Sequence, residues 1–360
     1  MHGDMIMQTK IIKVKETNFQ ESVREAGEIL KRGGLVAFPT ETVYGLGGDA
    51  LNARSSEKIY AAKGRPSDNP LIVHICDMED LEKIACGISE KAYRLADAYW
   101  PGPLTMILNK KELVPKETTG GLETVAVRMP NHPLALALIR AEGGFIAAPS
   151  ANTSGRPSPT KASHVAEDLD GRIEMILDGG DVGIGLESTI VDFTEETATV
   201  LRPGYITPQM IEEVIGEVKM DPALMRVKGD AKPKAPGMKY RHYAPKAQMY
   251  LVKGKTEEVI AKIAALAEEE KKQGRSVGIL CAEESKDSYP YGITKSLGSR
   301  EKEEEIAKNL FDVLREFDHM EVDVIYSEWF DAPGIGIAVM NRMLKAAGHQ
   351  VINAAEGERI

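Results

Sequence analysis

Residues 55–75 read SSEKIYAAKGRPSDNPLIVHI, and this stretch decides the fold class. Its first half has the composition of a helix that ends at Gly64, because glycine readily adopts the left-handed conformation found at helix C-termini. A polar turn follows, and the apolar run Leu71–Ile75 is typical of a buried strand. A helix, a turn and a strand in this order predict a mixed α/β architecture.

The same pattern extends outward on both sides of this stretch. Short β-rich runs separated by glycine and proline turns, with helical stretches between them, cover residues 35–40, 70–75, 104–108, 124–130, 145–151, 174–180, 188–193 and 199–204. We therefore expect one large α/β domain in residues 1–217. A chain of 360 residues is long enough for a second domain.

Residues 218–247 contain several prolines and show neither the strand period nor the helix period, which predicts a linker. In residues 248–360, strand-like and helix-like segments alternate, which predicts a small parallel α/β domain. The acidic run Glu301–Glu305 is typical of a solvated helix start.

Composition narrows the class of protein. No apolar run approaches the roughly 20 residues of a membrane-spanning helix, and the N-terminus lacks the pattern of a secretory signal. The three cysteines lack C-x-x-C spacing, so they indicate neither a zinc site nor a disulfide framework. We expect a cytoplasmic protein without membrane contact. Its net charge of -10 disfavours general binding of polyanions, although local patches can differ.

Polar and basic side chains gather at the turn after Gly64. Lys63, Arg65 and Asn69 lie in or before it, and His74 ends the strand that follows. The alternative is that Lys63 complements a helix dipole, Arg65 is solvated surface, and His74 is a core histidine. No phosphate-binding G-x-x-x-x-G-K-[ST] motif or catalytic triad is present, so any nucleotide site must be built from such loops.

A second polar loop, residues 150–160, contains Ser150, Asn152, Arg156 and Ser158 before a helix expected to begin near Lys161. Hydroxyls, an arginine and backbone N–H groups at a helix start suit an anion. The alternative is that Ser158 or Thr160 only caps the helix. The whole cluster favours a binding function.

Arg128 and Arg202 each end a strand-like run, where a side chain can point into a crevice, although an isolated arginine there is usually on the surface. Ser188 follows a glycine-rich loop. The motif PTETVYGLGGDA, residues 39–50, brings Thr40 and Glu41 close to several glycines that allow a ligand to approach the backbone.

These segments, in this order, resemble the YrdC/Sua5 family. The resemblance rests on residues 39–50, 58–75, 99–108, 125–135, 147–160, 177–192 and 200–204. It continues through APGMKYRHYAP, residues 235–245, and the α/β segment that follows, which are similar to the long Sua5-type branch. The implied fold is an open, twisted α/β domain with a concave cavity, followed by a small Rossmann-like parallel α/β domain.

The implied activity is that of an L-threonylcarbamoyladenylate synthase. Such an enzyme condenses L-threonine, bicarbonate or CO2 and ATP, accompanied by Mg²⁺, into threonylcarbamoyl-AMP and pyrophosphate. The product would pass to a tRNA threonylcarbamoyl transferase complex, which makes N6-threonylcarbamoyladenosine in tRNA. Direct RNA binding would be weak at most. No protein cage for a metal ion is expected.

The resemblance also assigns individual residues. Lys63, Arg65 and Arg202 would be catalytic, by stabilising negative charge. The positions expected to bind ATP are Lys63, Arg65, Asn69, Thr124, Ser150, Asn152, Ser158, Arg202, Tyr240 and His242, the last two from a linker expected to act as a lid. The positions expected to bind L-threonine are Thr40, His74, Arg128, the backbone of Ala148, and Ser188.

Two other functions remain open from the sequence. Basic and hydroxyl-rich loops can bind the phosphates of double-stranded RNA or tRNA without catalysis. A carbamoyl-phosphate-dependent carbamoyl transferase would use a related cavity, but that branch of the superfamily carries zinc-finger-like cysteines, which this sequence lacks.

Overall fold

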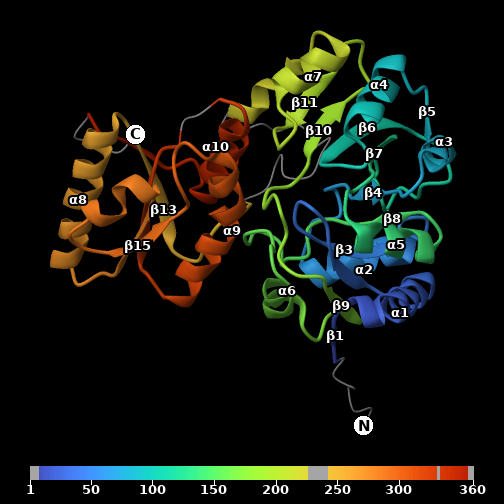
Figure 1. Ribbon diagram of the computed structural model, residues 1–360, viewed down its shortest axis with the longest axis horizontal. Coiled ribbons are helices and arrows are strands. Elements are labelled where there is room, and N and C mark those ends of the chain that lie inside the picture. Colours follow the sequence, from blue (N-terminus) through green and yellow to red (C-terminus); the bar gives the residue numbers. More distant parts are fainter. Residues whose placement is uncertain (1–7, 226–241, 331–332, 356–360) are drawn as a thin grey trace. The chain divides into compact units, whose positions relative to one another are not determined.

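The computed structural model describes residues 8–225, 242–330 and 333–355 (Figure 1). The chain divides into two compact units. The first comprises Met1–Ser154 and Ser158–Lys239, and the second comprises Gly155–Pro157 and Tyr240–Ile360. In the described parts of both units, no helix combines the length and apolar character needed to cross a membrane.

The first unit is built on one mixed sheet of twelve strands, in the order β1-β9-β2-β3-β8-β4-β7-β6-β10-β11-β12, with β5 paired to β6. The sheet contains parallel pairs, such as β4 with β7 and β6 with β10, and antiparallel pairs, such as β6 with β7. The strands are β1 (Lys10–Lys13), β2 (Val36–Pro39), β3 (Tyr44–Asp49), β4 (Ile72–His74), β5 (Ala85–Cys86), β6 (Leu104–Lys110), β7 (Thr124–Arg128), β8 (Ile146–Ala147), β9 (Met175–Asp178), β10 (Thr189–Asp192), β11 (Thr199–Arg202) and β12 (Lys219–Met220).

Helices of this unit bury their apolar sides against the sheet. They are α1 (Phe19–Lys31), α2 (Ala53–Lys63), α3 (Leu81–Ile84), α4 (Glu90–Tyr99), α5 (Pro133–Glu142), α6 (Ala162–Leu169) and α7 (Pro208–Ile215). Helix α2 ends as predicted, because Gly64 has a φ of 61° and closes it in the left-handed conformation. The predicted α/β fold class is confirmed.

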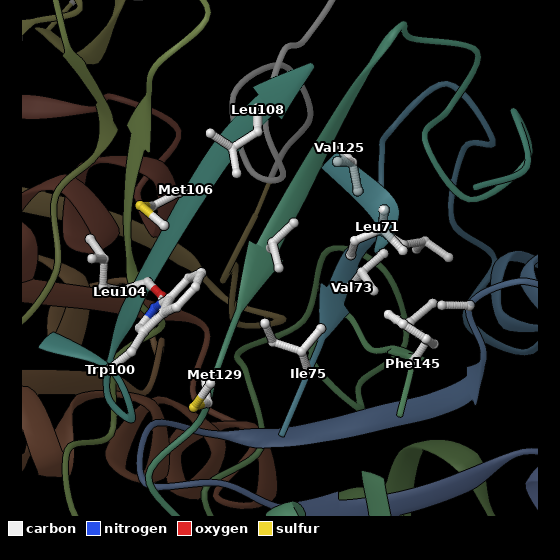
Figure 2. Close-up of a cluster of buried hydrophobic side chains, with 14 of the residues drawn as sticks. Leu71, Val73, Ile75, Trp100, Leu104, Met106, Leu108, Val125, Met129 and Phe145 are labelled. Carbon is white, nitrogen blue, oxygen red and sulfur yellow. Dashed lines mark hydrogen bonds between the residues drawn. The ribbon is translucent and has the colours of Figure 1, made fainter. Parts of the chain in front are cut away.

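A large apolar core lies on one face of the central strands. Successive side chains of a strand point to opposite faces, so every second residue of β4, β6 and β7 faces this core. Figure 2 shows the result: side chains from the three neighbouring strands gather in one cluster that includes Leu71, Val73, Ile75, Leu104, Met106, Leu108, Val125 and Met129. The residues between them, among them His74, Thr105 and Arg128, therefore face the other side.

Strand β3 was not expected from the sequence, because GLGG looks like a loop rather than a strand. The strand is almost entirely buried, and its glycines make room for close neighbours. A Cβ atom on Gly47 would lie 2.8 Å from Cε1 of Phe38 and 3.0 Å from Cγ2 of Ile146. These glycines therefore serve strand packing.

The second unit contains a five-stranded, all-parallel sheet in the order β15-β14-β16-β13-β17, which confirms the predicted parallel α/β domain. Its strands are β13 (Gln248–Lys253), β14 (Val277–Cys281), β15 (Ile293–Ser296), β16 (Val324–Glu328) and β17 (Val351–Asn353). Its helices are α8 (Thr256–Lys272), α9 (Glu303–His319) and α10 (Ile335–Ala346). Helix α9 begins within the acidic run, as predicted. Strands β15 and β17 were not predicted from the sequence, because they are short strands at the two edges of the sheet.

Candidate functional site

Three polar residues lie side by side on adjacent strands, on the face of the sheet away from the large core. Arg128 at the end of β7 is the register partner of His74 on β4 and of Thr105 on β6. Register partners in neighbouring strands project their side chains to the same face. All three are buried, with exposed fractions of 4% for Arg128, 3% for His74 and 0% for Thr105. The strand pattern that builds the core thus also builds this polar row.

Arg128 is held from three directions. Its Nε donates to the carbonyl oxygen of Gly102 at 3.3 Å, and its Nη1 donates to Oγ1 of Thr42 at 3.0 Å. Its Nη2 donates to Oε1 of Glu41 at 2.6 Å, which forms a salt bridge. The alternative of a surface arginine at this position is wrong. The guanidinium plane is fixed by these contacts before any ligand arrives.

His74 is a neutral side chain beside this cation. Burial, and then the nearby positive charge of Arg128, lower the pKa of His74 from 6.5 to about 3. Its Nδ1 lies 3.1 Å from the carbonyl oxygen of Ile72. A neutral imidazole can orient a hydroxyl or an amino group without adding positive charge next to Arg128.

Ser188 connects the polar row to Arg202. The hydroxyls of Ser188 and Thr105 lie 2.8 Å apart. Arg202, which ends β11 and is 5% exposed, donates from Nε to the carbonyl oxygen of Ser188 at 3.0 Å and from Nη2 to its hydroxyl at 3.1 Å. Ser188 therefore connects Arg202 to Thr105, which is the register neighbour of Arg128.

Thr40 and Ala148 complete the set predicted to bind threonine. Oγ1 of Thr40 lies 2.9 Å from Oγ1 of Thr42, which in turn contacts Arg128. Ala148, just beyond β8, donates its backbone N–H to the carbonyl oxygen of Ile72 at 2.9 Å, which places it beside β4 and His74. The structure brings all five predicted threonine positions to one region of the first unit.

Lys63 ties helix α2 to the second polar loop. It is 1% exposed, and its ammonium group donates to the carbonyl oxygens of Ser150 and Asn152. The hydroxyl of Ser150 donates to Oδ1 of Asn152 at 2.6 Å. Lys63 does lie in the last turn of α2, where a cation complements the helix dipole, but that alternative alone does not account for its contacts with the second polar loop. A buried ammonium group that binds carbonyl oxygens fixes the shape of this loop.

The turn after Gly64 is organised by Arg65, which is 8% exposed rather than solvated. Its Nε donates to the carbonyl oxygen of Asn69 at 3.2 Å, and its Nη2 to that of Pro70 at 3.0 Å. Oδ1 of Asn69 is buried without a hydrogen-bond partner among the described residues. Thr124 begins β7, and because β4 and β7 run parallel, this turn lies at the same sheet edge as Thr124.

Ser158 does not cap helix α6, so that alternative is wrong. The N-cap residue is Lys161, without a capping side-chain hydrogen bond. The Ser158 hydroxyl instead donates to Oε1 of Glu187, which is 7% exposed and directly precedes Ser188. This contact joins the second polar loop to the residues just before β10, where Ser188 accepts hydrogen bonds from Arg202 at the end of β11.

Two predicted nucleotide contacts cannot be placed in this region. Tyr240 lies outside the described residues. His242 is described, is half-buried and belongs to the second unit. Conversely, Glu41 was noted only as part of a motif, and Thr42, Thr105 and Glu187 were not predicted to belong to the site. Their signal was weak because each makes its defining contact with a residue distant in sequence, such as Arg128 with Glu41 across 87 positions.

One group of metal-capable side chains occurs in the described part of the chain, formed by Cys76, Asp77 and Asp80. Its carboxylates are already engaged, since Asp80 pairs with Lys83 at 2.7 Å and Asp77 pairs with Arg140 at 3.3 Å. Burial also raises the pKa of the Cys76 thiol to about 11, which disfavours the thiolate form that binds metals. This group does not fit a metal site.

Family models match both units. The model for Sua5, YciO and YrdC proteins, described as "Telomere recombination", matches residues 28–204. A second model, described as "Threonylcarbamoyl-AMP synthase, C-terminal domain", matches residues 206–348.

Individual relatives and solved structures extend the match to nearly the whole chain. The chain is 50% identical to a threonylcarbamoyl-AMP synthase of Pyrococcus abyssi, over 96% of this chain and 99% of the relative. It is 51% identical to a protein of the same name from Bacillus subtilis, over 92% and 94%. The crystal structure of P. abyssi Sua5 complexed with L-threonine has a TM-score of 0.89 and 48% identity, and covers 97% of this chain and 99% of that one.

Proposed function

Because the chain belongs to the Sua5/YrdC family, we propose that it is a threonylcarbamoyl-AMP synthase, which condenses L-threonine, bicarbonate or CO2 and ATP into threonylcarbamoyl-AMP and pyrophosphate. The observation that carries this proposal is the buried, pre-oriented guanidinium of Arg128 beside neutral His74. A fixed arginine fork suits an amino-acid carboxylate. The threonine complex of the P. abyssi relative favours this function over an RNA-binding module.

The chemistry requires positioning and charge stabilisation rather than a side-chain nucleophile. The amine of threonine captures CO2, and an oxygen of the resulting carbamate attacks the α-phosphorus of ATP while pyrophosphate leaves. Negative charge accumulates on the phosphates during this step. Arg202, which donates a hydrogen bond to Ser188, would stabilise that charge. Thr40, His74, Ser188 and the backbone of Ala148 would orient the amino acid.

Both polar loops, the turn after Gly64 and residues 150–160, would bind ATP. Lys63 fixes the carbonyl groups of the Ser150–Asn152 loop, so its catalytic effect would include holding that loop as well as adding positive charge. Arg65 fixes the turn that presents Asn69, whose buried Oδ1 can accept a hydrogen bond from a base or a ribose. Thr124 and Ser158 complete the described set.

Mg²⁺ would enter with ATP, held mainly by the phosphates, as is usual for this ion. Glu187 is the carboxylate that lies beside Ser158, and it is the residue we assign to orient the hydrated ion. The product would pass to a tRNA threonylcarbamoyl transferase complex, with weak direct RNA binding at most. A cytoplasmic location fits the three free cysteines, which suit a reducing compartment.

We retain the division into a catalytic domain, residues 1–217, a linker, residues 218–247, and a C-terminal domain, residues 248–360, as part of the proposal. The function of the linker as a lid stays a prediction from sequence, because residues 226–241 lie outside the described part of the chain.

The test is pyrophosphate release from ATP with Mg²⁺ and bicarbonate, measured with and without L-threonine. We expect release that depends on threonine. Arg128→Ala should raise the KM for threonine at least about 30-fold, because it removes one partner of a buried charged contact. Arg128→Lys is the matched variant that keeps the charge and loses the fork, and it should restore little. Release that is indifferent to threonine would contradict the proposal.

A further inference from the structure

The two carboxylate oxygens of Glu41 differ in their hydrogen bonding within the described part of the chain. Oε1 accepts the hydrogen bond from Arg128, and the side chain is 14% exposed. Oε2 is buried, and among the described residues it has no hydrogen-bond partner. A carboxylate has lone pairs for about four hydrogen bonds, and leaving a buried oxygen without a donor costs free energy. A group that donates hydrogen bonds to Oε2 would remove this cost.

His132 provides a second polar atom in the same surroundings. Its Nδ1 is buried and has no partner within the described ranges. Burial lowers the pKa of His132, and the negative charge of Glu41 partly opposes that shift. A neutral ring nitrogen and a carboxylate oxygen can both accept hydrogen bonds.

The pairing of Glu41 with Arg128 matches a zwitterion. An α-amino acid carries a carboxylate and an ammonium group on the same carbon atom, so its two charges must meet opposite charges that are also adjacent. Arg128 offers the positive group and Glu41 the negative group, 2.6 Å apart. An ammonium group has three donors and no acceptor, which suits acceptors that have no donor of their own.

We propose that Glu41 binds the α-ammonium group of the amino-acid substrate through Oε2, while Arg128 binds its carboxylate. This inference rests on the proposed function, and it adds a residue that selects for the amino group of the substrate. The same contact orients the nitrogen atom, and the carboxylate is the adjacent acceptor for the proton that the ammonium group must lose before its lone pair can capture CO2. It also explains why Glu41 accompanies Arg128 in a buried position, where an ion pair alone stabilises little after desolvation.

The test compares two ligands in two proteins. L-Threonine and 3-hydroxybutanoate differ by the amino group, and their dissociation constants can be measured by calorimetry without ATP. In the unmodified protein we expect 3-hydroxybutanoate to bind at least about tenfold more weakly. In Glu41→Gln, threonine should lose roughly ten- to hundredfold in affinity, while 3-hydroxybutanoate should change by less than about threefold.

Glu25→Gln is the matched control, because Glu25 forms an exposed salt bridge with Lys10 and should leave both affinities unchanged. Equal losses for both ligands in Glu41→Gln would mean that Glu41 only supports Arg128, and would overturn the proposal. Equal binding of the two ligands to the unmodified protein would overturn it without any variant. Failure of threonine-dependent pyrophosphate release in the unmodified protein would instead refute the proposed function.

Discussion

Glu41 in the first unit, which is largely buried, and Glu328 in the second, which is fully buried, each contact an arginine, and they differ in what surrounds their carboxylate oxygens. Oε1 of Glu41 meets Arg128, and its Oε2 meets no donor among the described residues. Both oxygens of Glu328 are fully engaged, one of them by Arg300. The first carboxylate is open to a ligand, and the second is closed by the protein itself.

The donors around Glu328 form a complete network at the end of β16. Its oxygens accept from the side chains of Ser285, Tyr289 and Arg300 and from the backbone N–H of Ala282. Burial, and then the charge of Glu328, raise the pKa of the Tyr289 phenol, so that it remains a hydrogen-bond donor. Strand ends of parallel sheets often bind ligands, but a network without a remaining acceptor indicates structure rather than binding.

The largest effect should come from breaking the closed network. Glu328→Gln places an NH2 group among four donors and removes the charge opposite Arg300. We expect the free energy of unfolding to fall by about 2–4 kcal/mol, slightly below the usual range because the Arg300 side chain is 29% exposed. Denaturant unfolding followed by circular dichroism measures it. A loss under about 1 kcal/mol would remove the distinction between the two carboxylates.

The next effect concerns His74, which is the register neighbour of Arg128, the arginine that pairs with Glu41. Its pKa is about 3 in the folded protein and 6.5 as the ordinary value, so the unfolded chain binds an additional proton between these values. Stability should therefore fall as the pH decreases from 7, by about 2 kcal/mol at pH 5. The comparison is the difference in pH dependence between the unmodified protein and His74→Gln. Identical profiles would mean that His74 titrates normally.

A smaller effect is expected for the same substitution at the open carboxylate. In Glu41→Gln, the amide oxygen can still accept from Arg128, and the NH2 group replaces an oxygen without a donor among the described residues. The free energy of unfolding should fall by about 1–2 kcal/mol, because the one hydrogen bond from Arg128 loses its charged acceptor, whereas four donors are affected at Glu328. Thermal and denaturant unfolding, run beside Glu328→Gln, give the comparison directly. A destabilisation as large as that of Glu328→Gln would show that Glu41 is structural.

The smallest effect should be that of an exposed carboxylate. Glu25 pairs with Lys10 at 2.7 Å, but their side chains are 39% and 55% exposed. Lys10→Ala should change stability by no more than about 1 kcal/mol, since solvent screens exposed pairs. Added salt should reduce even this difference. A larger loss of stability would mean that the distance between the charges, rather than their burial, determines how much these ion pairs stabilise the fold.

Local sequence patterns predicted the elements whose residues follow one period. The helix that ends at Gly64, the strand that contains Val73 and the parallel second domain were all correct. Strand β3 was missed because its glycines were interpreted as a loop, whereas Gly47 serves close packing against Phe38. No local pattern distinguishes these two uses of glycine.

The sequence indicated many of the residues of the candidate site, but it did not indicate which of them form hydrogen bonds with one another. Arg128 and Ser158 were selected from motifs, but their partners Glu41 and Glu187 lie 87 and 29 positions away in the sequence. Only the folded sheet brings such pairs together. The capping role considered for Ser158 was wrong for the same reason, because the nearby helix offered a local partner and the distant carboxylate is the actual one.

The alternation along β7 has a consequence for how this protein can change over evolutionary time. Val127 packs in the large core, and the next residue, Arg128, faces the candidate site. Deleting or inserting one residue in this strand would exchange the two faces, exposing the core and burying the arginine among apolar side chains. A point substitution in β7 can alter the site or the core packing separately. A change in the length of β7 would disrupt the site and the core packing at the same time. Length variation among relatives is therefore expected in loops and not in this strand.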